Sequence, residues 1–232
     1  MKITYWSDYA CPYCYIGNTR LKRAISDLGL EDEVEFESHS FELDQNAPKD
    51  VESTTVERFA EKYGLTKEKA QEQVDTISKT GIEEGIDFKY ATTLYTNTRD
   101  AHRLVQFAKL EKEPEIAEKL DKLLYDAYFT QNLKLSDEEV LVKIAENAGL
   151  EREETLEVLR SDKFNQEVVY DERLAMGYGI RAVPFYIFDE KYAIPGALSY
   201  EDFKKVLIQV KNNSEVDDDQ ETDNCEDGTC SI

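Results

Sequence analysis

The sequence predicts an α/β protein in which a long helical insertion separates two parts of one small sheet. Residues 2–8 and 34–43 alternate apolar and polar side chains as strands do, and a helical pattern lies between them. Residues 179–197 contain two more short strand patterns joined by a turn. From about residue 50 to about residue 160 the chain is helical in character almost throughout.

The first three elements are expected to form a β-α-β unit. Leu21, Ala24 and Ile25 lie at helical spacing, so we expect a helix over residues 12–28, and Gly29 provides its stop signal. A helix that connects two strands of one sheet favours parallel pairing and a right-handed crossover.

The last strands are expected to pair as a hairpin. A helix over about residues 162–177 leads into a strand within 179–189 and a second strand within 190–197. Together with the β-α-β unit, this hairpin makes a sheet of four strands. A helix over residues 199–211, with Phe203 on its apolar side, would cover the sheet.

These patterns divide the chain into three parts. Residues 1–49 and 161–211 form the sheet-containing domain, and residues 50–160 form an inserted all-helical subdomain of about four to six helices. Residues 212–232 form an acidic tail, in which no Lys or Arg occurs before a final pair of cysteines. We expect this tail to be mobile and solvated.

Composition and charge narrow the choice of partners. The chain has 232 residues, of which 41% are hydrophobic, which is enough for one sizeable core. Its net charge of −22 disfavours binding to nucleic acid and to anionic membranes. The N-terminus shows no basic region followed by an apolar stretch and a cleavage site, so we expect a cytoplasmic protein.

The motif that carries chemistry is Cys11-Pro12-Tyr13-Cys14, at the junction of the first strand and helix. Two cysteines three residues apart on a first helical turn lie on the same side, so they can form and break a disulfide with little backbone movement. The unpaired N–H groups and the dipole of the helix N-terminus favour a thiolate at the first sulfur, which is the attacking form. This arrangement predicts a redox dithiol in a thioredoxin-like fold.

Two other interpretations of the cysteines are open. Zinc would need two further ligands, and the only other cysteines are Cys225 and Cys230, so a zinc ion would clip the tail to the N-terminus of a non-catalytic binding module. A purely structural disulfide is disfavoured in a reducing compartment. We therefore favour the redox interpretation.

With this motif, the helical insertion and Val183-Pro184 before a late hairpin, the chain resembles the DsbA family of thiol-disulfide oxidoreductases. The segment Asn97-Thr98-Arg99-Asp100-Ala101-His102-Arg103-Leu104 resembles a helix-opening segment of the cytoplasmic FrnE-like branch. The resemblance covers about residues 1–211 and leaves the tail outside.

The resemblance implies a role for each matching residue. Cys11 would be the attacking thiolate, Cys14 the buried thiol that resolves the mixed disulfide, and Pro184 a cis-proline. Pro184 would leave the carbonyl and N–H of Val183 free for an extended substrate peptide. The implied activity is oxidation, reduction or isomerisation of protein or peptide disulfides, without metal or organic cofactor, and glutathione is a further candidate partner.

Several residues near the motif are weaker candidates. Pro12 and Tyr13 lie between the cysteines and are expected to contact substrate. Lone histidines are more often structural groups than proton shuttles, and a carboxylate near Cys14 would serve as its proton acceptor. The candidates for these proton-transfer roles are His39, His102, Asp8 and Glu37.

A second functional class shares this architecture. Kappa-type glutathione transferases and 2-hydroxychromene-2-carboxylate isomerases combine the same core with a helical insertion, and they place serine where Cys11 stands. The presence of Cys11 together with Cys14 disfavours these enzymes.

The tail cysteines are a candidate electron relay, and the alternative is a cysteine pair that takes no part in catalysis. Gly228 permits a turn that brings Cys225 and Cys230 within bonding distance, and a flexible arm keeps them at high effective concentration near Cys11. Replacing both Cys225 and Cys230 by Ser should therefore slow turnover in a disulfide-reduction assay. Kinetics equal to those of the unchanged protein would exclude the relay.

Overall fold

A mixed sheet of four strands forms the centre of the protein. The computed structural model describes the backbone of residues 1–223 and the side chains of residues 1–213. The strands are β1 (Lys2–Ser7), β2 (Glu35–Ser40), β3 (Phe185–Phe188) and β4 (Tyr192–Pro195), in the order β2-β1-β3-β4. β1 and β2 are parallel, and β3 pairs antiparallel with both β1 and β4. The predicted fold, a β-α-β unit completed by a late hairpin, is confirmed.

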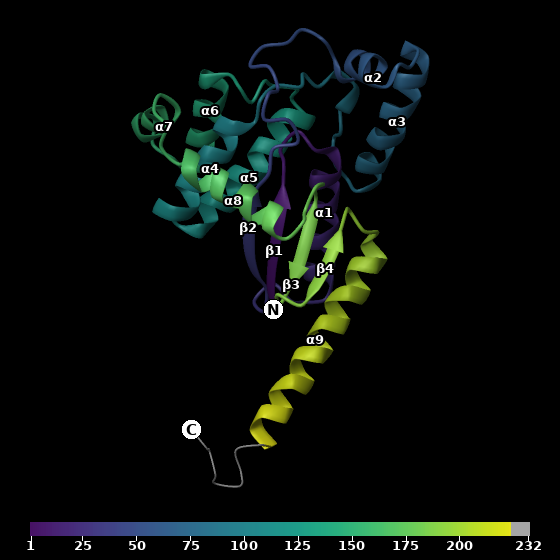
Figure 1. Ribbon diagram of the computed structural model, residues 1–232, viewed down its shortest axis with the longest axis vertical. Coiled ribbons are helices and arrows are strands. Elements are labelled where there is room, and N and C mark those ends of the chain that lie inside the picture. Colours follow the sequence, from purple (N-terminus) through teal and green to yellow (C-terminus); the bar gives the residue numbers. More distant parts are fainter. Residues whose placement is uncertain (224–232) are drawn as a thin grey trace.

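Helices make up most of the rest of the described chain. Six α-helices lie within the expected insertion, in agreement with the prediction of four to six, and a short 3₁₀ turn covers Tyr90–Thr92. The helices are α1 (Pro12–Asp27), α2 (Thr55–Tyr63), α3 (Lys67–Glu83), α4 (Arg99–Glu111), α5 (Pro114–Phe129), α6 (Glu138–Ala148), α7 (Arg152–Leu159), α8 (Asn165–Gly177) and α9 (Tyr200–Asp223). Figure 1 shows the inserted helices gathered at the end of the sheet to which β1 points.

The two faces of the sheet are covered by different helices. On one face, Ile3 and Tyr5 of β1 pack with apolar residues of α1 and α9, including Leu21 and Phe203. On the other face, Trp6 packs against α8, and its indole N–H donates a hydrogen bond of 3.1 Å to the Asp171 carbonyl. Because the side chains of β1 alternate between the two faces, helices pack on both of them. The result is three layers, with the sheet between α1 and α9 on one side and α8 on the other.

The insertion is packed directly against the end of the sheet that carries the cysteines. One continuous apolar cluster contains Trp6, Cys11 and Cys14 together with buried residues of the inserted helices, such as Leu104 and Leu124. The Tyr15 ring of α1 also stacks on the Tyr125 ring of α5, with centroids 5.0 Å apart and an angle of 11° between the planes. The insertion therefore supports the cysteine segment from one side.

The sequence predicts helix caps at Ser53, Thr66 and Ser136, and the structure confirms one of the three. Thr66 caps α3 by accepting a hydrogen bond from the Lys69 N–H. The caps of α2 and α6 each lie one residue later than predicted, at Thr54 and Asp137. The Ser136 hydroxyl is instead used in a hydrogen bond to the Lys49 carbonyl.

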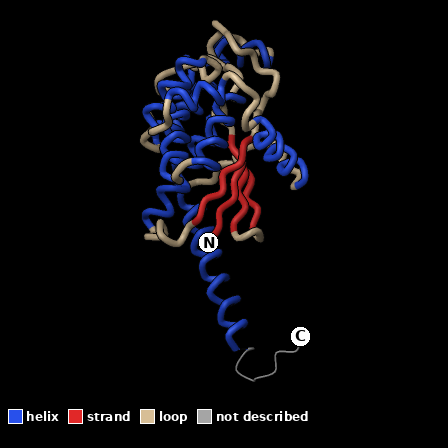
Figure 2. Tube along the Cα trace, turned by 90° about the vertical axis from the view of Figure 1, so that its left-hand side faces the viewer, coloured by secondary structure: helices blue, strands red, loops and turns tan. Residues whose placement is uncertain are grey.

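The C-terminal helix and the late hairpin differ from the prediction in their limits. α9 was expected to end at residue 211 and continues to Asp223, because no Gly or Pro interrupts residues 200–223. The predicted end of this helix at residue 211 is therefore wrong, and the mobility of the tail stays a prediction. Figure 2 shows α9 extending past the far end of the sheet. No helix in residues 1–223 is both long enough and apolar enough to cross a membrane.

Close packing of α1 on the sheet depends on Gly17. A Cβ added at Gly17 would lie 2.6 Å from the Tyr186 hydroxyl oxygen and 3.1 Å from the Ala197 Cβ. Gly17→Ala should therefore lower the free energy of unfolding by about 1–3 kcal/mol, measured by urea denaturation. Gly177→Ala is the matched control, since nothing lies within 4 Å of an added Cβ there, and it should be neutral or stabilising by up to about 1 kcal/mol.

Candidate redox site

The two cysteines lie at the junction between β1 and α1. Cys11 is the N-cap residue of α1, with φ −92° and ψ 113°, and Pro12 occupies the first helical turn. The Cys11 N–H donates a 3.0 Å hydrogen bond to the Asp8 carbonyl, and the Cys14 N–H donates one of 3.1 Å to the Cys11 carbonyl. Both thiols are free and buried, with exposed fractions of 4% for Cys11 and 0% for Cys14.

The segment before β3 completes the site from the other end of the chain. The Val183–Pro184 peptide bond is cis, as the family resemblance implies. Because Phe185 pairs with Trp6 across β3 and β1, this segment is held beside the cysteines. The Cys11 thiol lies 3.5 Å from the Val183 carbonyl oxygen and donates to it, whereas the Val183 N–H has no hydrogen-bond partner in residues 1–223. The family resemblance implies that both the carbonyl and the N–H of Val183 are free for a substrate peptide. The hydrogen bond from Cys11 to the carbonyl differs from this expectation.

The two sulfurs differ in their electrostatic surroundings. Burial raises the pKa of the Cys14 thiol well above its usual range, and a hydrogen bond and charge from Cys11 add to the shift, while a hydrogen bond from the Asp8 backbone opposes it. Cys14 therefore stays protonated while Cys11 is reduced. A proton must leave Cys14 before it can attack a disulfide formed at Cys11.

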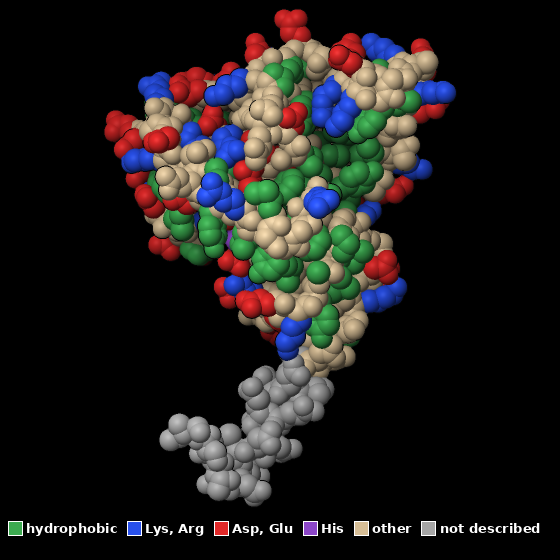
Figure 3. All heavy atoms as spheres, in the orientation of Figure 1, with side chains coloured by type: hydrophobic (Ala, Val, Ile, Leu, Met, Phe, Trp, Pro, Cys, Tyr) green, Lys and Arg blue, Asp and Glu red, His purple; other side chains and the backbone are tan. Residues whose placement is uncertain are grey.

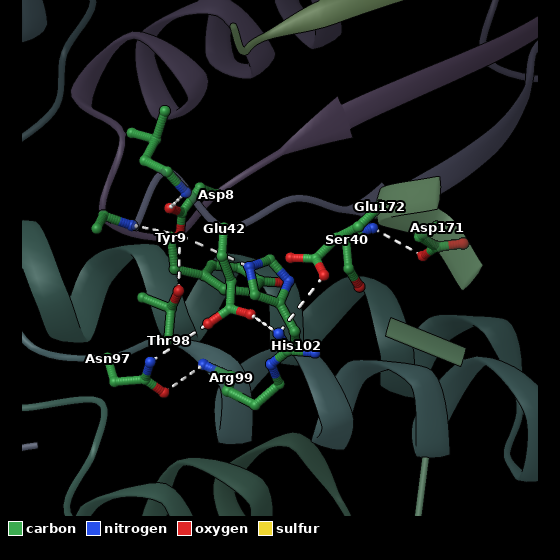
Figure 4. Close-up of polar contacts among 12 residues, drawn as sticks. Asp8, Tyr9, Ser40, Glu42, Asn97, Thr98, Arg99, His102, Asp171 and Glu172 are labelled. Carbon is green, nitrogen blue, oxygen red and sulfur yellow. Dashed lines mark hydrogen bonds and ion pairs between the residues drawn. The ribbon is translucent and has the colours of Figure 1, made fainter. Parts of the chain in front are cut away.

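A buried carboxylate beneath the motif holds three segments of chain together. Asp8 Oδ1 accepts hydrogen bonds from the Ala10 N–H (3.1 Å) and the Thr98 hydroxyl (2.9 Å), and Asp8 Oδ2 accepts one from the Leu43 N–H (2.8 Å). His102 Nε2 lies 3.6 Å from Asp8 Oδ1 and has no hydrogen-bond partner. Figure 4 shows these groups converging below the start of α1. The structure thus brings together Asp8 and His102, which the sequence had named separately.

A second buried charge cluster lies beside Asp8 and was not predicted. Arg99 Nη2 lies 2.5 Å from Glu42 Oε2 and 3.5 Å from Glu172 Oε2, and the Asn97 amide donates a 3.3 Å hydrogen bond to Glu42 Oε1. Burial raises the pKa of the Glu42 carboxyl to about 7, although His102 and Arg99 oppose the shift. The sequence signal for this cluster is the segment starting at Asn97, which resembles the helix-opening segment of the FrnE-like branch.

The other histidine belongs to a structural network. His39 Nδ1 lies 2.6 Å from Asp171 Oδ1, and the His39 ring stacks on Trp6 with centroids 4.8 Å apart. The Ser40 N–H and the Gln106 amide donate to Asp171 Oδ2 at 2.7 Å and 2.5 Å. These bonds fix α8 to β1, β2 and α4. His39 is therefore satisfied by a structural role, which agrees with the simpler of the two roles weighed for it.

The remaining sequence candidates are placed as follows. Glu37 pairs with Lys2 and Thr4 near the start of β1, so its contacts do not reach Cys14. Pro12 is buried, whereas the Tyr13 side chain is 46% exposed beside the cysteines. On the face shown in Figure 3, hydrophobic side chains gather between the insertion and the hairpin, with Lys and Arg side chains at the margins.

Metal binding by the described residues finds no support. Within the described part of the chain, no group of three or more His, Cys, Asp or Glu side chains is arranged to hold a metal ion. The zinc-clipped alternative needs Cys225 and Cys230, and both lie outside the described residues, as does the expected relay.

The raised pKa of Glu42 makes the stability of the fold depend on pH. Between pH 4.5 and about 7, the folded protein keeps a proton on Glu42 that the unfolded chain has lost. The contribution of Glu42 to the free energy of unfolding therefore falls as the pH rises through this window. Glu42→Gln should remove this loss of stability, because glutamine carries no titrating proton. The urea midpoint of the wild type minus that of the variant should therefore decrease as the pH is raised from about 5 to about 8.

Glu61→Gln is the control for this measurement, since Glu61 is exposed on α2 and has no ion pair in the described residues. Its difference from the wild type should be independent of pH. A pH-independent difference for Glu42→Gln as well would contradict the assignment.

Comparison with known proteins agrees with this geometry. A solved structure of a probable DsbA oxidoreductase from Streptomyces coelicolor, SCO1869, is 34% identical in sequence and superposes with a TM-score of 0.85. The match covers 91% of this chain and 90% of that one. The uncharacterised protein YwbO of Bacillus subtilis (strain 168) is 26% identical over 215 residues, which are 88% of this chain and 94% of YwbO.

A more distant likeness is to a 2-hydroxychromene-2-carboxylate isomerase, at 14% identity and a TM-score of 0.64, with 96% of this chain and 98% of that chain covered. This likeness shows a shared fold. Residues 2–208 match the DSBA-like thioredoxin domain family. With the cysteine pair at the start of α1 and the cis-proline beside it, the chain belongs to the DSBA-like thioredoxin domain family.

Proposed function

We propose that this protein is a thiol-disulfide oxidoreductase that acts on protein and peptide disulfides through Cys11 and Cys14. The observation that carries the proposal is the position of the Cys11 thiol, at the N-terminus of α1 and 3.5 Å from the Val183 carbonyl before the cis-proline. Cys14 is fully buried one turn further along the helix. This arrangement gives the two thiols separate roles in one exchange reaction.

In the reducing direction, the Cys11 thiolate attacks one sulfur of a substrate disulfide. A bond forms between Cys11 and that sulfur, the substrate S–S bond breaks, and the other sulfur leaves as a thiolate. Cys14 then loses its proton and attacks Cys11, which releases the second substrate thiolate and leaves a Cys11–Cys14 disulfide. Two electrons pass to the substrate, and the protons of the two enzyme thiols appear on the two product thiols. An external dithiol returns the enzyme to its reduced state.

The second step requires the buried Cys14 thiol to lose its proton. The Asp8 backbone favours this loss, because its hydrogen bond to Cys14 lowers the pKa of the thiol, whereas the charge of the Asp8 carboxylate raises that pKa. We assign Asp8 a positioning role, because its carboxylate oxygens are already engaged by Ala10, Leu43 and Thr98.

We also propose that the protein belongs to the FrnE-like branch, which the resemblance of residues 97–104 supports. A cytoplasmic location is supported by the N-terminal sequence, and a reducing compartment favours reduction or isomerisation of disulfides over their oxidation. Glutathione is a further candidate partner. The isomerase-like alternative has the fold in common, at 14% identity. It is disfavoured by the thiol at position 11, since those relatives place serine there.

Insulin reduction with dithiothreitol as the external dithiol tests the proposal. Cys11→Ser should lose more than about a hundredfold of the rate, because the attacking thiolate is gone. Cys14→Ser should instead accumulate a mixed disulfide at Cys11, visible as an added substrate mass by mass spectrometry. Both variants should unfold at temperatures close to that of the wild type. Full activity of Cys11→Ser would refute the mechanism.

A further inference from the structure

A cavity of about 400 Å³ lies beside the segment that leads to the cis-proline. Its charged lining comes from three arginines, Arg99, Arg173 and Arg181, and two glutamates, Glu42 and Glu172. We propose that this cavity is a subsite for a carboxylate of the substrate, carried close to the sulfur that Cys11 attacks. The inference rests on the proposed oxidoreductase function and names a specificity determinant for it.

The cavity is within reach of the reactive sulfur. Arg181 precedes Val183 by two residues, and the Val183 carbonyl oxygen is 3.5 Å from Cys11 Sγ. Two extended residues span at most about 7 Å from Cα to Cα, so the Arg181 Cα lies within about 13 Å of the sulfur. Glu42 follows the end of β2, at the same edge of the sheet as Cys11. A side chain one or two residues from a substrate cysteine can therefore enter the cavity.

The charge of the cavity favours an anion. Arg173 and Arg181 are exposed, and neither makes an ion pair within the described part of the chain. Arg99 is shared between Glu42 and Glu172, and Glu42 has a pKa of about 7, so part of its negative charge is absent near neutral pH. The lining is thus net positive, in a chain whose overall charge is −22.

Unpartnered polar atoms point to a ligand of peptide type. Arg99 Nη1 and Glu172 Oε1 are both buried without a hydrogen-bond partner, and Glu172 is only 8% exposed. A buried donor and a buried acceptor in one cavity are normally satisfied. A peptide carrying a carboxylate supplies both needs, since the carboxylate accepts from Arg99 and a peptide N–H donates to Glu172.

The carboxylate has two sources that the same chemistry recognises. One is an acidic side chain that flanks the reactive cysteine of a peptide or protein, and the other is the free carboxylate of a small peptide disulfide. Peptide disulfides that differ only in Glu, Gln or Lys beside the cysteine probe the first source. Comparing the reduction rate of oxidised glutathione with that of the uncharged bis(2-hydroxyethyl) disulfide probes the second source.

The decisive variant reverses the charge of the two unpaired arginines. The wild type should reduce the Glu peptide with a kcat/KM about tenfold above that for the Lys peptide, and about 0.5 M salt should weaken this preference. Arg173→Glu/Arg181→Glu should abolish or invert the preference. Lys119→Glu/Lys143→Glu changes the net charge equally at exposed positions on α5 and α6 outside the cavity, and it should keep the preference.

Binding without turnover separates this inference from the proposed function. Cys11→Ser/Cys14→Ser protein should bind a fluorescent Glu peptide, with Ser in place of its cysteine, more tightly than the Lys peptide by anisotropy. That result would support the subsite even if no disulfide were reduced, in which case only the proposed function would fail. An unchanged Glu-over-Lys preference in the arginine variant, or no preference in the wild type, would overturn the subsite.

Discussion

The arrangement of the site depends on one buried carboxylate. Asp8 binds the Ala10 and Leu43 N–H groups and the Thr98 hydroxyl, and so joins the turn before Cys11, the segment after β2 and the start of α4. At 1% exposure, an unpaired carboxylate would be strongly unfavourable, so these three donors are needed for the fold as well as for the site. The helical insertion is thereby fixed to the redox motif by hydrogen bonds as well as by apolar packing.

The other wall of the site is held by a second buried carboxylate. Asp171 of α8 binds His39, the Ser40 N–H and Gln106, and its carbonyl accepts from the Trp6 indole. Since α8 leads into the Val183–Pro184 segment, these bonds fix the point from which the segment that contacts Cys11 starts. The site is therefore fixed on both sides. This suits thiol-disulfide exchange, in which the attacking sulfur must approach along the axis of the S–S bond that breaks.

Charge is distributed against the average of the chain. The protein carries a net charge of −22, yet three arginines gather in the cavity beside the cis-proline segment. Two of them come from α8 and the loop that follows it, and Arg99 comes from the start of α4. The overall negative charge repels anionic partners in general, whereas the proposed carboxylate subsite would attract those that place an acidic group in the cavity.

Sequence alone determined the local features of this protein. The spacing of Cys11 and Cys14, the first strand and helix, the late hairpin and the helical insertion follow from periodicity and from stop signals, which act over a few residues. The cis-proline came from family resemblance. Only the tertiary structure decided which polar residues meet. Glu42, Arg99 and Glu172 lie far apart in the sequence, and their cluster depends on how the insertion and α8 pack on the sheet, which no local pattern encodes. The acidic composition after residue 211 predicts a solvated tail, but the absence of Gly and Pro from residues 200–223 lets α9 continue to Asp223.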